Sequence, residues 1–145
     1  MDMRQLADLQ QVAGAQFDRD AADLRQSVAA EARLNAALAE IAASQTKRAE
    51  ALTGGLEIAF AQAGAALWQG WAEARRRELL MALANQRAVT EAIKLRARAS
   101  FGCKSALEAL RDRATTTELE EANRRELETL VDLEVHKRWM TRPGG

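Results

Sequence analysis

The only proline of this chain, Pro143, lies next to the glycines of its C-terminal end. A proline inside a helix removes a backbone donor and clashes with the preceding turn, so residues 1–142 contain no such break. Alanine, leucine, glutamate and arginine, which all favour helix, fill almost every window, whereas strand-favouring residues are scarce. The sequence therefore predicts an all-α chain of long helices.

The first predicted helix covers residues 3–52. Its larger apolar residues recur at intervals of mostly three, four or seven, at Leu6, Ala13, Phe17, Leu24, Val28, Leu34, Leu38, Ile41 and Leu52. This spacing is typical of a helical stripe close to a heptad seam. Glu31 and Gln45 interrupt the stripe seven residues either side of Leu38, and many neighbouring positions are alanine. Because alanine buries little surface, we expect modest stability that depends on length.

The sequence LTGG at residues 52–55 predicts the end of the first helix. Two consecutive glycines suit a left-handed C-cap and a reversal of the chain. We expect the reversal over residues 53–66, where the apolar, glycine-containing LEIAFAQAGAA forms a short helical or looped crossing. A second helix is predicted over residues 67–140. Its possible kink lies at 115–117, where three threonines disfavour helix slightly and Thr117 with Glu120 fits the capping box of a new helix.

When the two predicted helices are paired, the C-terminal part of the second helix has no partner in the first. Suppose that they pair antiparallel about a reversal centred between residues 54 and 59. The first helix then covers the second helix only as far as a residue between 107 and 116. The last 25 to 30 residues or so then form an overhang of about 40 Å, at a helix rise of about 1.5 Å per residue. The predicted fold is one domain over residues 1–145: a long antiparallel two-helix coiled-coil hairpin with an overhanging C-terminal helix.

Charge and cysteine content narrow the class of protein. The 21 acidic and 21 basic residues cancel, which argues against nucleic-acid or membrane binding driven by net charge. One cysteine, Cys103, excludes an internal disulfide framework and fits a reducing compartment. The first ten residues contain interspersed charge rather than the apolar region of a signal peptide, and no window resembles a membrane span. We expect a soluble, cytoplasmic protein.

No pattern in the sequence predicts catalysis, a cofactor or a metal. His136, the sole histidine, has Glu134 two residues away, and helical residues two apart point to different faces. The metal-binding spacings of di-iron bundles and zinc proteases are missing, and Gly54–Gly55 lacks the rest of a phosphate loop. We expect His136 at the surface and Cys103 as a small buried or half-buried side chain. The chain is therefore predicted not to be an enzyme.

The arginine triplet at 75–77 is interpreted as a solvated helix face. Consecutive helical residues cannot share one face, and Glu73 and Glu78 dilute the positive charge. A phosphate-binding patch for nucleic acid or lipid is the alternative.

Trp68, Trp71 and Arg75 follow the spacing i, i+3, i+7 and so form one stripe, in which Arg75 is placed to stack on Trp71. Two roles are open for this stripe. The rings could close the end of the hairpin, or they could bind a partner, since tryptophan and arginine are frequent anchors of protein interfaces. One ring inward and one outward would serve both roles.

The predicted overhang carries apolar residues at Leu127, Leu130, Leu133, Val135 and Trp139. An isolated helix with an uncovered apolar stripe is marginal in water, so it should fold back or bind a partner. We favour binding because no second turn signal permits an easy fold-back.

The pattern W..W.EARRREL...LA..RA followed by ARASFGCKSALEALRDR resembles the small coiled-coil stalk proteins of type III export machines, the FliJ/YscO family. The resemblance extends over nearly the whole chain and rests on its helical layout together with Trp68, Trp71, the LANQRA segment at 83–88 and Phe101 ahead of Leu107 and Leu110. The family is similar to the coiled coil of the gamma subunit of rotary ATPases. This chain is richer in alanine and glycine than we expect of the family.

The resemblance implies a non-catalytic protein of flagellar protein export, cytoplasmic and peripherally associated with a membrane export machine. It implies that the helix over residues 118–140 enters the hexameric export ATPase. The region of Trp68, Trp71 and Arg75, with residues 38–45 opposite, would contact the cytoplasmic part of the export gate membrane protein, and export chaperones are further partners. The alternatives are a stalk of a rotary ATPase proper, a coiled-coil scaffold or export chaperone that dimerises through its overhang, and a basic helix for DNA or lipid.

Overall fold

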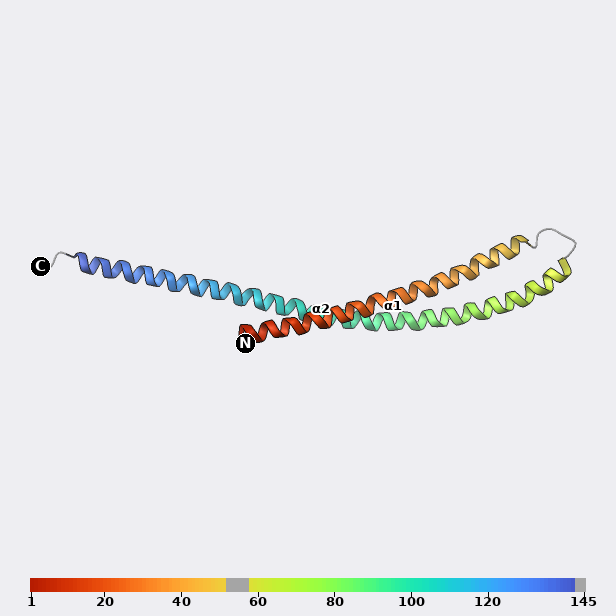
Figure 1. Ribbon diagram of the computed structural model, residues 1–145, viewed down its shortest axis with the longest axis horizontal. Helices are drawn as coiled ribbons and strands as arrows, with labels where there is room; N and C mark the ends of the chain where they lie inside the picture. Colours follow the sequence, from red (N-terminus) through yellow and green to blue (C-terminus); the bar gives the residue numbers. More distant parts are fainter. Residues whose placement is uncertain (52–57, 143–145) are drawn as a thin grey trace. The chain divides into compact units, whose positions relative to one another are not determined.

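The computed structural model of the chain describes residues 1–51 and 58–142 (Figure 1). It consists of two helices, α1 over Met3–Ala51 and α2 over Ile58–Thr141. Within these described ranges there is no strand. The prediction of an all-α chain with two long helices is confirmed.

The N-terminus of α1 is held by a capping arrangement around Asp2. The Arg4 backbone N–H donates to Asp2 Oδ1 at 3.4 Å, and the Asp2 backbone N–H donates to Gln5 Oε1 at 3.3 Å. The Leu6 N–H closes the first turn onto the Asp2 carbonyl at 3.0 Å. Side chains thus satisfy backbone donors that a helix start otherwise leaves without partners. The predicted reversal at LTGG lies outside the described residues.

The helix α2 begins earlier than the sequence pattern indicated. Residues 58–66 of the predicted reversal belong to α2, which starts at Ile58 instead of Leu67. The segment is rich in alanine, the strongest helix former, and its neighbours offset the roughly 1 kcal/mol that Gly64 costs relative to alanine. The prediction gave the glycine too much weight.

The three threonines at 115–117 lie inside α2, which neither ends nor restarts there. The hydroxyls of Thr115 and Thr116 each donate to the backbone carbonyl four residues earlier, at 2.9 Å. Threonine in a helix commonly satisfies its hydroxyl in this way, at a small cost in helix stability. The capping box expected from Thr117 is therefore not the start of a new helix.

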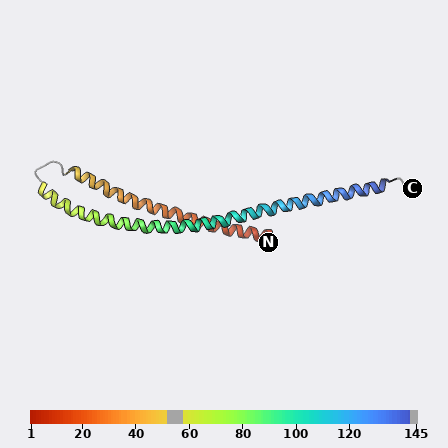
Figure 2. The same ribbon diagram turned by 180° about the vertical axis from the view of Figure 1, so that it is seen from behind.

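The chain divides into two compact units, one made of Met1–Ala15 with Phe101–Gly145 and the other of Gln16–Ser100. In the second unit α1 and α2 lie side by side, as both ribbon views show (Figures 1 and 2). Arg96 contacts Asp23 at 3.6 Å, Ser27 contacts Thr90 at 2.6 Å, and the Arg48 guanidinium lies over Trp68. In these pairs the residue number on α2 decreases as the residue number on α1 increases.

Contact between the helices of this unit follows positions spaced alternately by three and four residues. We call these positions the α1–α2 seam. Its buried and half-buried members are Phe17, Asp20, Leu24, Ser27, Glu31, Leu34, Leu38, Ile41 and Gln45 on α1, and Ala65, Trp68, Ala72, Leu79, Leu83, Gln86, Thr90, Ile93, Ala97 and Ser100 on α2. Ser27 occupies the place expected for Val28, which is 49% exposed. Glu31 and Gln45 stay on the seam although they interrupt its apolar pattern.

A polar layer crosses the middle of the α1–α2 seam. Ser27 Oγ lies 2.6 Å from Thr90 Oγ1 and accepts from Gln86 Nε2 at 2.7 Å, and Thr90 Oγ1 donates to the Gln86 carbonyl at 2.9 Å. Ser27 and Thr90 are 4% and 3% exposed. A hydrogen-bonded polar layer disfavours shifted registers, because a shift would leave these groups buried without partners.

Replacing Ser27 with alanine should lower the free energy of unfolding by about 1–2 kcal/mol, because a buried hydroxyl and a side-chain amide each lose a partner. Urea unfolding followed by circular dichroism measures this change. The matched control is Ser44→Ala, an exposed serine on the same helix, for which we expect a change within about 0.5 kcal/mol. Equal effects of the two substitutions would show that the polar layer does not stabilise the fold.

In the first unit, α1 covers only part of the α2 segment that belongs to this unit. Leu6 is 5% exposed, and Arg111 Nη1 donates to Gln10 Oε1 at 3.2 Å. Lys104, Leu107 and Ala114 are half-buried on the α2 side. From Thr115 to Arg142 every residue is exposed. We call residues 115–142 the exposed C-terminal segment.

Candidate partner-binding surfaces

The two tryptophans of α2 have different environments. Trp68 packs against the buried cluster of Ile41, Ala72 and Leu79, whereas Trp71 is 58% exposed. Their ring centroids are 6.3 Å apart with the planes tilted by 43°. Trp68 thus belongs to the α1–α2 seam, and the Trp71 ring presents its surface outward. This is the one-inward, one-outward arrangement that the spacing left open.

The cation that stacks on Trp68 comes from the other helix. The Arg48 guanidinium carbon lies 4.2 Å from the Trp68 ring centroid, within cation–π range. Arg75, which the spacing placed over Trp71, instead pairs with Glu78 at 3.2 Å. An i, i+3 ion pair on one helix keeps the long side chain along the helix surface. The sequence pattern did not reveal Arg48 because it lies on α1, far away in the chain.

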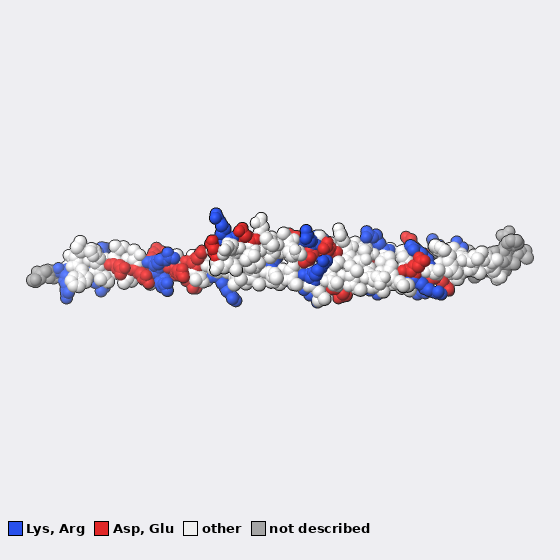
Figure 3. Space-filling model, turned by 90° about the horizontal axis from the view of Figure 1, so that it is seen from below, with Lys and Arg blue, Asp and Glu red and all other residues white. Residues whose placement is uncertain are grey.

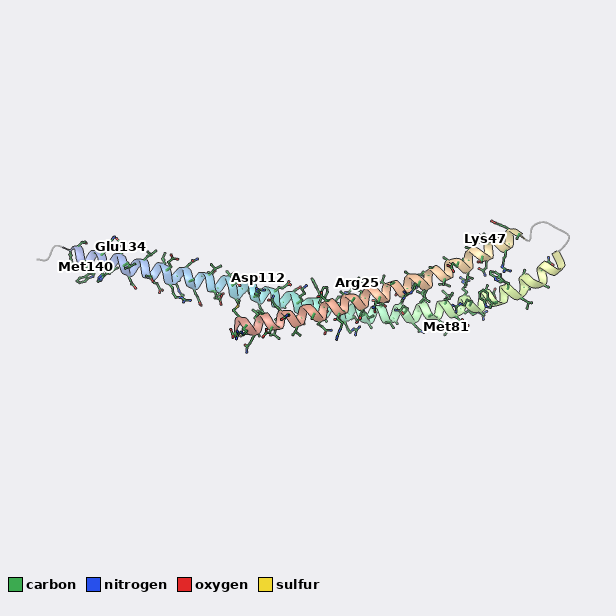
Figure 4. All side chains as sticks on the ribbon, in the orientation of Figure 1. Arg25, Lys47, Met81, Asp112, Glu134 and Met140 are labelled. Carbon is green, nitrogen blue, oxygen red and sulfur yellow. The ribbon has the colours of Figure 1, made fainter. Side chains whose placement is uncertain are left out.

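Trp71 belongs to an exposed apolar face of α2. We call Leu67, Trp71, Ala74 and Met81 the Trp71 face, because steps of three, four and seven residues place them on one side of a helix. Leu67 is 80% exposed and Met81 69% exposed, and Figure 4 shows Met81 on the side of α2 away from α1. Leu67 and Met81 were absent from the predicted site, although their spacing from Trp71 was a usable signal.

A shallow groove lies between the helices in this part of the second unit. Its lining residues are Leu38, Ala39, Ala42, Gln45, Arg76 and Leu80. This groove includes the segment of α1 that the resemblance assigned, with the tryptophans, to one binding region. Arg76 thus borders this groove, whereas Arg75 pairs with Glu78.

Comparison of Trp68→Ala with Trp71→Ala separates the structural ring from the exposed one. Loss of Trp68 should lower the free energy of unfolding by about 2–3 kcal/mol, because the ring packs on the buried cluster and under Arg48. Loss of Trp71 should change it by less than about 1 kcal/mol. Urea unfolding provides the measurement. A larger effect at Trp71 would contradict the assigned environments.

The apolar pattern of α2 changes face at the start of the exposed C-terminal segment. The spacing of the α1–α2 seam continues past Ser100 through the half-buried residues Lys104, Leu107 and Ala114. Beyond Ala114, steps of four and three lead only to charged residues: Glu118, Glu121, Arg125, Glu128 and Asp132. A helix could not pack on these positions without desolvating charge. The stripe that faces α1 therefore ends at Ala114, because the next positions along it are charged.

A second stripe begins one residue later along the helix. Leu119, Asn123, Glu126, Leu130, Leu133, Lys137 and Met140 follow steps of four and three, and we call them the C-terminal face. A one-residue offset turns a helical position by about 100°, so this face is not a continuation of the surface beneath α1. Leu130 is 57% exposed, Leu133 58% and Met140 75%. The C-terminal face is therefore a separate face, with apolar and polar residues in turn, and none of the described residues of its unit covers it.

The predicted binding residues of this segment do not all share that face. Leu130 and Leu133 lie on it and Leu127 lies at its edge. Trp139 follows Leu130 by nine residues, about half a turn round the helix, and so points to the other side. There the Arg142 guanidinium carbon lies 5.9 Å from the Trp139 ring centroid. Trp139 is 70% exposed and forms a surface of its own with Arg138 and Arg142.

The remaining candidates from the sequence do not form a reactive site. Cys103 is exposed, which corrects the expectation of a buried or half-buried thiol, because position 103 falls between the inward positions Ser100 and Lys104. His136 is exposed, as expected. Residues 1–51 and 58–142 contain no group of three or more histidine, cysteine or acidic side chains placed to hold a metal ion.

Charge is distributed without a large patch of one sign on the face that Figure 3 presents, where basic and acidic side chains alternate along the molecule. The arginines at 75–77 are all exposed. No helix among the described residues is both long and apolar enough to cross a membrane.

No family model, curated protein or solved structure matches this chain.

Proposed function

We propose that this chain is a non-catalytic stalk or coupling protein of a type III, flagellar, protein export apparatus. In this proposal the two helices form an antiparallel coiled coil, and the end of α2 overhangs it. The overhanging helix enters the hexameric export ATPase, and the Trp71 face contacts the cytoplasmic part of the export gate. Export chaperones are further partners, and the protein works in the cytoplasm at the membrane-bound export machine.

The observation that carries this proposal is the C-terminal face on the exposed C-terminal segment. Its leucines, 57–58% exposed, lie on a helix that α1 does not cover beyond Ala114. Apolar side chains on an isolated helix are a typical binding surface for a partner that supplies the missing covering. A ring-shaped partner with a central opening could receive such a helix and cover its C-terminal face.

A second surface supports a coupling role rather than simple binding. The Trp71 face lies on the second unit, on residues 67–81 of α2, whereas the C-terminal face lies on residues 119–140 of the first unit. Exposed tryptophan and methionine side chains at helical spacing are frequent anchors in protein interfaces. Two faces at separate stretches of one helix permit two partners to be bound at once.

The test is direct binding of the purified full chain to the export ATPase and to the cytoplasmic part of the gate protein, each immobilised separately. We expect the chain to bind both. The discriminating control is a Trp71→Ala variant, which should lose binding to the gate and keep binding to the ATPase. Failure of the wild-type chain to bind either protein would overturn the proposal.

A dimerising coiled-coil scaffold or export chaperone is the second candidate function, and the C-terminal face favours it too, since a second copy could cover the same leucines. Light scattering of the chain alone separates the two functions. A dimer that persists at all concentrations supports the scaffold, and a monomer at low concentration supports the stalk.

A further inference from the structure

We propose that the C-terminal face binds a second copy of this chain in antiparallel orientation, as a weak and reversible dimer of the free protein. This inference does not depend on the proposed export partners. It rests on the order of charged and apolar residues along the C-terminal face, all of which are exposed.

The order of residues on the face is self-complementary when two copies run in opposite directions. With the midpoint between Val131 and Asp132, Leu130 of each copy lies opposite Leu133 of the other, and Glu126 lies opposite Lys137. Opposed layers in an antiparallel pair of helices combine the two kinds of seam position in this way. The two leucine layers are therefore flanked on both sides by a Glu–Lys pair.

Other arrangements of the same face are chemically worse. A parallel pair would set Glu126 against Glu126 and Lys137 against Lys137, and like charges at seam positions repel. An antiparallel pair shifted by one heptad sets a charged side chain against a leucine, either Lys137 against Leu133 or Glu126 against Leu130. Of these arrangements, only the antiparallel register centred between residues 131 and 132 sets leucine against leucine and also sets Glu126 against Lys137.

The charges that would form these pairs are available. Among the described residues, neither the Glu126 nor the Lys137 side chain takes part in an ion pair, whereas Arg125 next to Glu126 is engaged with Glu121 at 3.9 Å. The seam is short and includes Asn123 opposite Met140, so the affinity should be low. We expect a dissociation constant between about 10 μM and 1 mM, typical of a small apolar contact.

Sedimentation equilibrium of the full chain at low ionic strength tests the dimer. The apparent mass should rise from 15.9 kDa toward twice that value as concentration increases through this range. Glu126→Lys and Lys137→Glu alone should each weaken dimerisation at least about tenfold, because each places like charges opposite one another twice. An equimolar mixture of the two variants should dimerise about as well as wild type. A monomer at every concentration, or charge reversals without effect, would overturn the proposal.

Orientation is tested separately with a spin label. In a Cys103→Ser background, a label at Thr141→Cys should give a distance of about 30 Å between copies in the antiparallel dimer, from a rise of about 1.5 Å per residue. A parallel dimer would bring the same labels within roughly 15 Å, given an interaxial distance of about 8–10 Å. The short distance would overturn the antiparallel assignment. Neither experiment contains the export ATPase, so failure here leaves the proposed function to its own test.

Discussion

Replacing Leu79 with alanine should lower the free energy of unfolding by about 2–4 kcal/mol, the largest loss expected from a single truncation in this chain. Leu79 is 4% exposed and belongs to the cluster with Ile41 and Ala72, on which Trp68 also packs. Alanine at neighbouring seam positions cannot move in to fill the space, because its side chain is a single methyl group. The loss therefore combines removed apolar burial with an unfilled cavity.

The measurement is urea unfolding followed by the helical circular dichroism signal, in which the midpoint should fall by about 1–2 M for a typical urea dependence. Leu80→Ala is the matched control, since Leu80 is the next residue on the same helix and is 44% exposed. We expect its effect to be below about 1 kcal/mol. Similar midpoints for the two variants would contradict the assigned phase of the α1–α2 seam.

Replacing Leu130 with aspartate should reduce binding to the export ATPase at least about tenfold, without a measurable change in unfolding. Under the proposed function Leu130 is desolvated in the complex. A carboxylate at this position would lose the apolar contact, worth about 1.5–3 kcal/mol for a fully buried leucine, and would add a cost of desolvation. Leu130 is 57% exposed in the free chain, so the fold does not depend on it.

Val135→Asp is the matched control for this experiment. It introduces the same charge into the same segment, but Val135 lies five residues from Leu130 and so well away from it round the helix. We expect the ATPase affinity of Val135→Asp to stay within about threefold of wild type, a difference of about 0.7 kcal/mol. Equal loss in both variants would indicate a general charge effect, and retained binding of Leu130→Asp would remove the C-terminal face from the ATPase interface.

The sequence predicted the helices well because helix formation is largely local. Absence of internal proline and a high alanine content determine that α1 and α2 form, and the start of α1 near Met3 follows from the side-chain caps beside it. The start of α2 was predicted too late. A single glycine such as Gly64 does not end a helix when the residues around it are mostly alanine.

The spacing of apolar residues could not predict which polar residues lie in the α1–α2 seam. Ser27 and Thr90 are buried because each satisfies the other across the helices, and that compensation involves residues far apart in the chain. Val28 was the better hydrophobic choice for the seam and is nevertheless half exposed. Local hydrophobicity ranks such neighbours wrongly when the polar one has a partner.

The sequence by itself determined that this chain is helical, where apolar residues recur along it, and that charged residues occupy positions 118–132 of one stripe. Only the tertiary structure decided which stripe faces α1. That choice places Trp68 inward and Trp71 outward, ends the α1–α2 seam at Ala114 and leaves the C-terminal face uncovered. The physical reason is that a helix face becomes a core or a surface only when another element covers it, and covering depends on distant residues.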